Sequence, residues 1–155
     1  MGKIWWVNQK HKVNGRVANE VVWSPNSPSG SGPEPMHWKS MRQAEVGDVI
    51  LHYSNQFIVA LSNVIAPAVE ANNPFNGDDT WGEHGKQIAV DIEWLKDPIA
   101  SADIPLEIRK LSSAKGEPFQ HDGNRVKQGY FFRVPPVLWE AIKALVSESD
   151  QTLLL

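Results

Sequence analysis

The sequence predicts an α+β fold, in which a compact, barrel-like, mixed but mostly antiparallel sheet is flanked by short helices. Most of the patterned stretches are short runs of apolar, β-favouring residues bounded by polar or turn-forming residues, which is typical of strands. Two of these runs, residues 48–54 and 57–65, are joined only by Asn55 and Gln56, which indicates a hairpin. The helical patterns are few and short, so they predict helices at the periphery of the sheet.

The other strands are predicted by composition and alternation. Residues 3–8 form an apolar run that ends in polar residues, and residues 20–23 form a second, shorter extended piece. In residues 87–95 the apolar side chains from Ile88 to Trp94 occupy every second position, as in a half-buried strand. Residues 129–134 are rich in aromatic and β-branched side chains and predict the last strand.

Three short helices complete the prediction. The spacing of apolar residues predicts one helix within residues 36–44. A second is predicted over residues 103–111, with Asp103 as its N-cap and Pro105 in its first turn. The third, over residues 137–146, follows two prolines and carries its apolar residues on one face.

The composition is that of an ordinary globular domain. At 155 residues the chain has the length of one domain, which we place at residues 1–148, with residues 149–155 as a tail or the start of a linker to a missing domain. No apolar run approaches the ~18 residues of a membrane span. The absence of cysteine excludes disulfides and thiolate metal sites and, with no signal-peptide pattern, predicts a cytoplasmic protein. Residues 24–35, which contain four prolines and four serines, predict a loop.

The charges are unevenly distributed. The net charge is −3, which argues against a surface that binds nucleic acid everywhere. However, residues 1–43 carry six Lys and Arg against two acidic residues, and residues 115–133 carry four against two. If the fold joins these two segments, they form one positive face for phosphates; otherwise they are scattered solvated charges.

Motifs for catalysis or metal binding are missing from the sequence. The five histidines are scattered, and no two have the i, i+3 or i, i+4 spacing that places two ligands on one helix face. Neither a glycine-rich phosphate loop after a strand nor a Gly-x-Ser-x-Gly elbow occurs. The acidic residues of the loop 78–83 lack a full cation-ligand spacing. We therefore expect no metal, no cofactor and no catalytic residue.

Seven tryptophans are the most informative residues of the chain. Four lie inside patterned elements and are assigned to the core: Trp5, Trp6, Trp94 and Trp139. Trp38, on its short helix, fits a core position or a site equally well. Trp23 and Trp81 lie at element edges among Ser, Asn, Gly and Asp, which favours a ligand cage, because indole stacks on planar groups.

Three segments resemble the EVE domains. In residues 38–54 a Met-Arg pair precedes a Gly-Asp that opens a strand, and the strand ends in Tyr53 and Ser54, as in the EVE signature. Residues 57–64 match the strand that follows in that family, and residues 129–142 are similar to its closing strand and last helix. The matching segments follow one another in the same order over nearly the whole chain.

EVE domains belong to the PUA-like superfamily and resemble YTH domains, which hold a methylated base in an aromatic cage. The resemblance implies a PUA-like barrel with a pocket for a flipped, modified base, in which Trp23 and Trp81 are the walls. The residues expected to bind the base are Trp23, Trp81, Asn8, Gln9, Ser24, Tyr53, Ser54, Trp38 and Asp122. Those expected to bind phosphates are Lys10, Lys12, Arg16, Lys39, Arg42, Arg125 and Lys127.

The expected function is that of a non-catalytic reader of DNA that carries methylated or hydroxymethylated cytosine or N6-methyladenine. The resemblance further implies the specificity domain of a modification-dependent restriction system, fused to or associated with a nuclease or motor domain. Three alternatives stay open: a YTH-type reader of methylated RNA, an enzyme or small-molecule binder with His52 or His121 as base, and a structural interaction domain.

Overall fold

The computed structural model describes residues 2–9, 12–13, 16–17, 21–26, 35–73 and 84–154, and only the backbone of residues 12, 13, 16, 17, 36 and 37. Its main sheet has six strands in the order β4-β7-β6-β5-β1-β8. These strands are β1 (Ile4–Asn8), β4 (Val21–Pro25), β5 (Val49–Ser54), β6 (Phe57–Asn72), β7 (His84–Ala100) and β8 (Phe131–Arg133). A two-stranded ribbon, β2 (Lys12–Val13) with β3 (Arg16–Val17), lies apart from this sheet.

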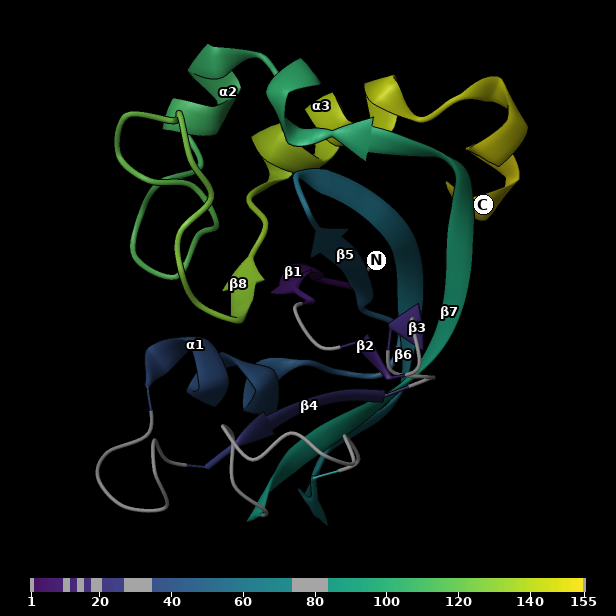
Figure 1. The fold of residues 1–155 in the computed structure, drawn as a ribbon, viewed down its shortest axis with the longest axis vertical. Coiled ribbons are helices and arrows are strands. Elements are labelled where there is room, and N and C mark those ends of the chain that lie inside the picture. The colour runs from purple at the N-terminus through teal and green to yellow at the C-terminus, as the bar shows by residue number, and fades with distance from the viewer. Residues whose placement is uncertain are drawn as a thin grey trace.

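The sheet is a curled half-barrel of mixed direction. β1 pairs with β5 in parallel, whereas all the other neighbours are antiparallel. The long strands β6 and β7 curve side by side along the height of the molecule (Figure 1). The shorter strands pair with them on either side, β4 next to β7 and β5 next to β6. The predicted α+β class is therefore confirmed.

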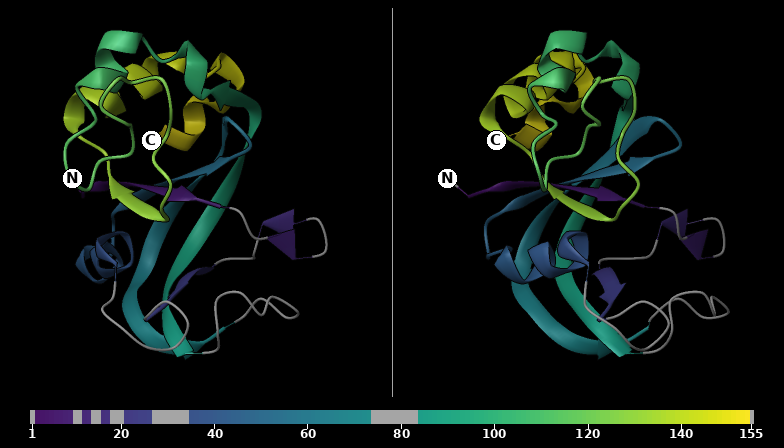
Figure 2. Two further views of the ribbon diagram at one scale, coloured as in Figure 1. Left: turned by 60° about the vertical axis from the view of Figure 1, so that its left-hand side comes forward. Right: turned by 90° about the vertical axis from the view of Figure 1, so that its left-hand side faces the viewer.

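Helices cover both faces of the sheet. α1 (Met36–Lys39) and the 3₁₀ helix η2 (Ser40–Gln43) lie on one side of β8, and α2 (Leu106–Lys110) and α3 (Pro136–Leu145) lie on the other (Figures 1 and 2). β1 runs between two cores, since successive side chains of a strand point to opposite faces. Trp6 belongs to the core under α3, and Trp5 and Val7 belong to the core under α1.

The β5–β6 hairpin turns where the sequence predicts it. Asn55 and Gln56 both have positive φ, 49° and 73°. This is the conformation of a two-residue type I′ turn, whose twist matches that of the strands. The prediction of this hairpin is confirmed, although β6 continues well beyond residue 65.

The start of α2 differs from the prediction. Asp103 lies in a separate 3₁₀ turn, η3 (Ser101–Asp103), and Pro105 occupies the N-cap position of α2. No side-chain cap hydrogen bond is formed there. The expected cap at Asp103 is therefore wrong, because the chain is extended at Ile104 before it enters the helix.

Residues 149–154, expected in a tail, form part of the packed domain. They belong to the 3₁₀ helix η4 (Glu148–Leu154), and Leu153 and Leu154 pack against the core under α3. The Asp150 carboxylate accepts hydrogen bonds from the backbone N–H groups of Lys96 and Asp97, both at 3.0 Å. These two bonds hold η4 on β7 and lower the pKa of Asp150.

Trp94 is the one tryptophan of the predicted core that the structure exposes. Its side chain is 48% exposed, whereas Trp5, Trp6 and Trp139 are buried, as predicted. Trp94 has the same parity on β7 as the buried Ile88 and Val90, but it lies further along the strand. In that part of β7 the opposite face is buried, at Leu95 and Ile99. The alternation of apolar residues from Ile88 to Trp94 therefore continues beyond the core that buries Ile88 and Val90, and Trp94 is exposed.

Candidate functional site

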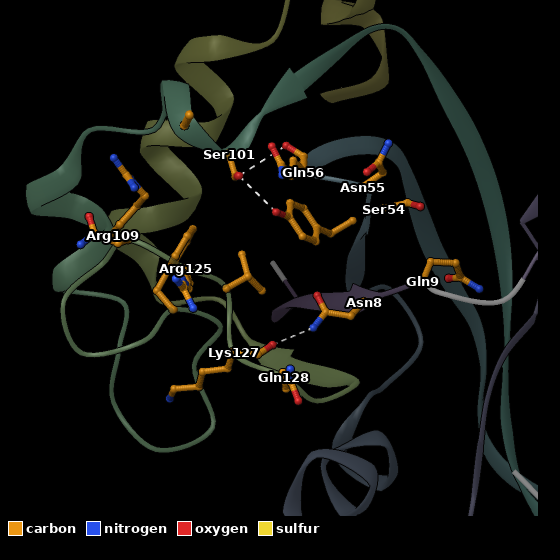
Figure 3. A pocket seen from close by; sticks show the side chains of 15 residues that line it. Asn8, Gln9, Ser54, Asn55, Gln56, Ser101, Arg109, Arg125, Lys127 and Gln128 are labelled. Atoms are coloured by element: carbon orange, nitrogen blue, oxygen red, sulfur yellow. Dashed lines mark hydrogen bonds between the residues drawn. The ribbon is translucent and has the colours of Figure 1, made fainter. Parts of the chain in front are cut away.

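A pocket lies where the end of β1 meets the β5–β6 hairpin, η3, α2 and residues 119–128 (Figure 3). Its volume is about 750 Å³. It is lined by Asn8, Gln9, Tyr53, Ser54, Asn55, Gln56, Ser101, Ala102, Arg109, Phe119, Asn124, Arg125, Val126, Lys127 and Gln128. Six residues of the sequence prediction are in this set: Asn8, Gln9, Tyr53, Ser54, Arg125 and Lys127.

The lining of the pocket has a distinct chemistry. It contains three cationic side chains and six carboxamides, but no carboxylate. The whole chain, by contrast, carries a net charge of −3. A pocket of this kind attracts phosphates and offers donors and acceptors to the edge of a polar heterocycle.

Aromatic rings form one wall of the pocket. Tyr53 packs against Trp6 with ring centroids 4.9 Å apart, and Trp6 in turn meets Phe119 edge-on at 5.7 Å. The Tyr53 hydroxyl lies 3.2 Å from the Ser101 hydroxyl. Because Trp6 is fully buried, it holds the Tyr53 ring in place while that ring stays half-buried at the pocket.

Asn8 ties the pocket wall to β1. Its Nδ2 donates to the carbonyl oxygens of Lys127 and Gly129, at 3.0 and 2.9 Å, and its Oδ1 accepts a 2.9 Å bond from the Trp6 indole. Both amide hydrogens are thus used within the protein. Asn8 positions residues 127–129, and only Oδ1 retains hydrogen-bonding capacity.

The three cations differ in their freedom. Arg109 donates to the carbonyl oxygens of Ile104 and Gly123, and Lys127 donates to that of Ala114 at 2.7 Å. Burial lowers the pKa of Lys127, and nearby Glu117 acts in the opposite direction. The side chain of Arg125 is exposed and has no hydrogen-bond or ion-pair partner within the part of the chain that the structure describes. It is the cation with most freedom to meet a phosphate.

Gln9 lies at the edge of the pocket, apart from the basic side chains (Figure 3). It is only 2% exposed. Its Oε1 lies 3.2 Å from Nδ1 of His52, and Nε2 of His52 lies 2.7 Å from the Ser62 hydroxyl. Burial lowers the pKa of His52 to about 3, so the imidazole is neutral. With both nitrogens engaged, His52 is poorly placed to act as a general base, and His121 is an exposed turn residue that does not line the pocket.

Trp23 does not line this pocket. Its ring is fully buried, and its indole nitrogen donates to the carbonyl oxygen of Ala71 at 3.0 Å. The ring packs against Gly85, where a Cβ would overlap both Trp23 and the Ser24 carbonyl. Ser24, on the opposite face of β4, is also buried, and its hydroxyl has no hydrogen-bond partner among the described residues.

The remaining residues expected at the base lie elsewhere. Trp81 is outside the described residues. Trp38 is buried in the core under α1, at 8% exposure. Asp122 is exposed in the turn just before Asn124, where its carboxylate accepts the Asn124 backbone N–H, and it does not line the pocket.

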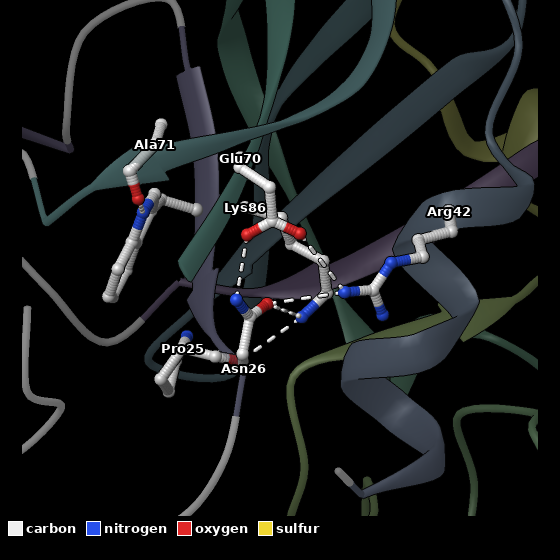
Figure 4. A network of polar contacts seen from close by, with 7 residues as sticks. Pro25, Asn26, Arg42, Glu70, Ala71 and Lys86 are labelled. Atoms are coloured by element: carbon white, nitrogen blue, oxygen red, sulfur yellow. Dashed lines mark hydrogen bonds and ion pairs between the residues drawn. The ribbon is translucent and has the colours of Figure 1, made fainter. Parts of the chain in front are cut away.

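Arg42 belongs to a separate polar network (Figure 4). Its Nη2 lies 3.5 Å from the Glu70 carboxylate and donates to Asn26 Oδ1 at 3.3 Å. The buried Lys86 donates to the Pro25 carbonyl at 3.1 Å and to Asn26. The hydrogen bond from Asn26, followed by the contact with Arg42, lowers the pKa of Glu70. This network joins η2 to the ends of β4, β6 and β7.

Of the remaining cations expected at phosphates, Lys39 has a described side chain, and it does not line the pocket. Lys39 is exposed on α1, on the other side of β8 from residues 119–128 (Figures 1 and 2). Lys10 lies outside the described residues, and the side chains of Lys12 and Arg16 are not described. Of the two basic segments, the second contributes Arg125 and Lys127 to the pocket, whereas the described cationic side chains of the first do not line it.

Several pocket residues were not anticipated from the sequence. Asn55 and Gln56 were identified only as the hairpin turn, Arg109 only as part of a helix, and Phe119 not at all. Their position next to Tyr53 and Ser54 could have indicated the first two. Arg109 lies on a helix that was predicted, but its part in a site depends on how that helix packs, and Phe119 lies in an irregular segment that carries no periodic signal.

Among the described residues, no group of three or more His, Asp or Glu is arranged to hold a metal ion. Within the same residues, no helix has both the length and the apolar character needed to cross a membrane. The pocket therefore has to be interpreted from its polar, cationic and aromatic side chains.

No family model and no curated protein sequence matches the chain. Solved structures do match its fold. Human THYN1 in complex with DNA containing 5-methylcytosine is 12% identical, with a TM-score of 0.56 over 94% of this chain and 98% of that one. The DUF55 domain of human thymocyte nuclear protein 1 is 12% identical with a TM-score of 0.52, over 93% and 98% of the two chains. A Pseudomonas putida protein is 10% identical with a TM-score of 0.55, over 93% and 99%.

At such low identities these similarities show the fold alone. The curled six-stranded sheet with its short helices is an α+β fold that this chain shares with human THYN1. The pocket described above lies at the end of β1 of this fold.

Proposed function

We propose that this protein is a non-catalytic reader that binds a modified base of DNA, with the pocket at the end of β1 as its contact surface. One observation carries this proposal: Asn8, Gln9, Tyr53, Ser54, Arg125 and Lys127, which the sequence singles out for bases and phosphates, line one pocket without a carboxylate. They come from three separate parts of the chain. That the fold brings residues expected at a base and residues expected at phosphates to one pocket supports the proposal.

The physical chemistry of the pocket suits a nucleotide. A base stacked on Tyr53 gains about 1–3 kcal/mol, which is comparable to the few kcal/mol that flipping a base out of a duplex costs. Arg125, Lys127 and Arg109 supply positive charge for the flanking phosphates. The carboxamides offer both donors and acceptors to the base edge.

The fold gives independent support for DNA carrying a modified base. Human THYN1, which shares the fold, has been solved in complex with DNA containing 5-methylcytosine. We therefore rank methylated or hydroxymethylated cytosine first and N6-methyladenine second, in DNA rather than RNA. In its biological setting we propose that the chain is the specificity module of a modification-dependent restriction system, acting with a nuclease or motor domain.

The aromatic partner of the base has two candidates. One is Tyr53, whose ring lies at the pocket. The other is the pair Trp23 and Trp81 proposed from the resemblance. Since the Trp23 ring is fully buried and bonded to Ala71, it can hold a base only if the segments that cover it move. The two candidates make different predictions for mutants.

The proposal is tested by fluorescence anisotropy with matched duplex and single-stranded oligonucleotides. Each carries one 5-methylcytosine, 5-hydroxymethylcytosine, N6-methyladenine or unmodified base, and each has an RNA counterpart. We expect tighter binding to a modified DNA than to its unmodified match. Equal affinity for all of these ligands would contradict the proposal, and a preference for methylated RNA would favour a YTH-type reader instead.

Two pairs of variants test which residues contact the base and which contact the phosphates. Tyr53→Leu should weaken binding about tenfold or more if Tyr53 stacks on the base, whereas Trp81→Ala should do so if the tryptophan cage does. Arg125→Gln should weaken binding to every DNA alike, and Lys96→Gln, which changes an exposed lysine on β7, is its matched control. Unchanged binding in Tyr53→Leu and Arg125→Gln would exclude the pocket.

A further inference from the structure

The carboxamide of Asn8 is held in one orientation by three hydrogen bonds. Its Nδ2 donates to the backbone carbonyl oxygens of Lys127 and Gly129, at 3.0 and 2.9 Å, and its Oδ1 accepts from the indole N–H of Trp6 at 2.9 Å. The two carbonyls can only accept and the indole can only donate. Exchanging the nitrogen and the oxygen of Asn8 would therefore bring acceptor against acceptor and donor against donor.

The oxygen of this carboxamide has one lone pair to spare. A carbonyl oxygen can accept two hydrogen bonds, and Trp6 supplies the one donor that contacts Oδ1 among the described residues. Asn8 lines the pocket, although its side chain is only 7% exposed. An acceptor that is nearly cut off from water gains from a donor that a ligand supplies.

Oδ1 lies beside one of the two stacking candidates, the ring of Tyr53. Asn8 and Tyr53 are Cα partners in the parallel register of β1 and β5, so their side chains project from the same face of neighbouring strands, about 4.8 Å apart. In Figure 3 the nitrogen of Asn8 points to the Lys127 carbonyl, and the oxygen points the other way, toward the side of the pocket that carries Ser101. The Tyr53 hydroxyl meets Ser101 on that same side. A base stacked on Tyr53 thus has an edge within reach of Oδ1.

We propose that Oδ1 of Asn8 accepts a hydrogen bond from the exocyclic amino group of the bound base. This inference rests on the proposed function, and it adds a chemical requirement that the function alone does not contain. The ligand is a base with an amino group, such as a cytosine or an adenine, and a base with a carbonyl at that place, such as thymine, is rejected. Asn8 reads the class of base, and the modification is recognised by other groups.

The fixed orientation is what makes this acceptor selective. A carboxamide that is free to turn over can offer its nitrogen to a carbonyl as readily as its oxygen to an amino group. Asn8 cannot turn over, because both hydrogens of Nδ2 are used by Lys127 and Gly129. Thymine, which has the ring and the methyl group of 5-methylcytosine, would place its carbonyl oxygen against Oδ1. A site that is built to hydrogen-bond one group rejects an analogue that leaves this bond unmade.

The requirement is tested with DNA ligands that differ only at the amino group. The target base lies opposite an abasic site, so it is unpaired in every duplex and differences in base pairing do not contribute. It is 5-methylcytosine, thymine, or 5-methyl-2-pyrimidinone, which lacks the amino group and has no substituent in its place. We expect the wild type to bind 5-methylcytosine about tenfold more tightly than either analogue in anisotropy titrations. Equal affinity for 5-methylcytosine and 5-methyl-2-pyrimidinone would overturn the inference.

The variant Asn8→Ala assigns this preference to Asn8. Its affinity for both ligands falls where the pocket wall is disturbed, but the ratio of the two affinities should fall to about one, because the acceptor is gone. Arg125→Gln is the matched control: it should weaken binding to both ligands alike and keep the wild-type ratio. If Asn8→Ala retains the wild-type ratio, another residue reads the amino group and the inference is wrong.

A measurement on the wild type covers the case in which Asn8→Ala does not fold. The ¹³C chemical shift of a side-chain carbonyl responds to the hydrogen bonds that its oxygen accepts. We expect the Cγ signal of Asn8 to move downfield on saturation with 5-methylcytosine DNA and to move much less with 5-methyl-2-pyrimidinone DNA. Asn63, which is exposed on β6 and does not line this pocket, is the control and should respond to neither. An Asn8 signal that moves equally with both ligands would overturn the inference.

These ligands separate the inference from the proposed function. Cytosine and 5-methylcytosine both carry the amino group, so a preference between them tests the reading of the modification. The pair 5-methylcytosine and 5-methyl-2-pyrimidinone shares the methyl group, so a preference between them tests Asn8. A protein with only the second preference contradicts the proposed function and supports the role of Asn8, whereas a protein with only the first supports the proposed function and contradicts the inference.

Discussion

Asn8 shows how a single side chain can define one wall of a pocket. Its carboxamide donates to two backbone carbonyls on residues 127–129 and accepts from the indole of Trp6. A carboxamide is the only side-chain group, shared by Asn and Gln, that combines two such donors with a neutral acceptor. Asn8, which the sequence analysis assigns to base binding, thus holds the segment that carries Lys127 in place through these hydrogen bonds.

We predict that Asn8→Ala lowers the free energy of unfolding by about 2–4 kcal/mol, because it leaves the buried indole N–H of Trp6 and two carbonyls without partners. Urea denaturation followed by tryptophan fluorescence measures this change. Asn124→Ala, at an exposed position of the same pocket, is the control and should stay within about 0.5 kcal/mol of the wild type. Equal losses in the two variants would contradict this account of Asn8.

His52 links the stability of the protein to pH. In the folded protein its pKa is lowered to about 3, whereas in the unfolded chain it is near the ordinary value of about 6.5. Between these values the unfolded chain binds the extra proton, so stability is complete above the unfolded pKa and is lost as pH falls.

We predict that the free energy of unfolding decreases by up to ~1.4 kcal/mol per pH unit as pH falls below about 6.5. Urea denaturation at pH 7.5, 6.0 and 5.0 measures the slope, above the range in which most carboxylates titrate. His52→Gln should flatten it, and the exposed-site control His121→Gln should not. A wild-type slope that persists in His52→Gln would show that another group is responsible.

At the scale of elements, β4 is held at the edge of the sheet by a close approach to β7. Pro25 of β4 pairs with Gly85 of β7, and the ring of Trp23 lies against the same glycine. The outward-facing N–H of Trp23 donates to the hydroxyl of Tyr130 at 3.3 Å. A backbone N–H of this edge strand thereby joins it to Tyr130, just before β8.

We predict that Gly85→Ala destabilises the protein by about 3 kcal/mol, since a Cβ there overlaps rigid backbone at Ser24 and the Trp23 ring. Gly47→Ala is the control. Gly47 has a φ of +94° with open space around it, so only the backbone conformation is strained, at a cost of about 1 kcal/mol. Denaturant unfolding of both variants tests this order, and an equal or smaller loss in Gly85→Ala would refute the steric explanation.

At the scale of the whole molecule, the charge of the pocket differs in sign from the net charge of the chain. The chain has a net charge of −3, yet three cations and no carboxylate line the pocket. A positive pocket on a chain of net negative charge favours the orientation in which the pocket faces the DNA.

We predict that affinity for duplex DNA falls with salt with a slope of log K against log[salt] of about −3 or smaller in magnitude, because at most three pocket cations meet phosphates. Arg125→Gln should reduce the magnitude of the slope by about one, and Lys96→Gln should leave it unchanged. Anisotropy titrations between 50 and 300 mM NaCl provide the measurement. A slope that is much steeper would show that cations outside the pocket, such as Lys39, also contact DNA.

The elements were predictable because their signals are local. Alternating or continuous apolar runs gave the strands, and the two polar residues between residues 48–54 and 57–65 gave the hairpin. Whether a side chain is buried in a core cannot be predicted from its neighbours in the sequence, as Trp23 and Trp94 show. The first has polar neighbours and is fully buried, whereas the second continues an apolar alternation and is 48% exposed.

By itself, the sequence determined the α+β class, the order of the elements, and a set of polar and basic residues suited to nucleotides. Only the tertiary structure decided which of these residues meet. It brought Asn8, Tyr53 and Arg125 to one pocket with Arg109 and Phe119, and it placed Trp38 and Arg42 elsewhere. The physical reason is that secondary structure follows from neighbours within a few positions, whereas a site forms where strand pairing and the curl of the sheet bring distant segments together.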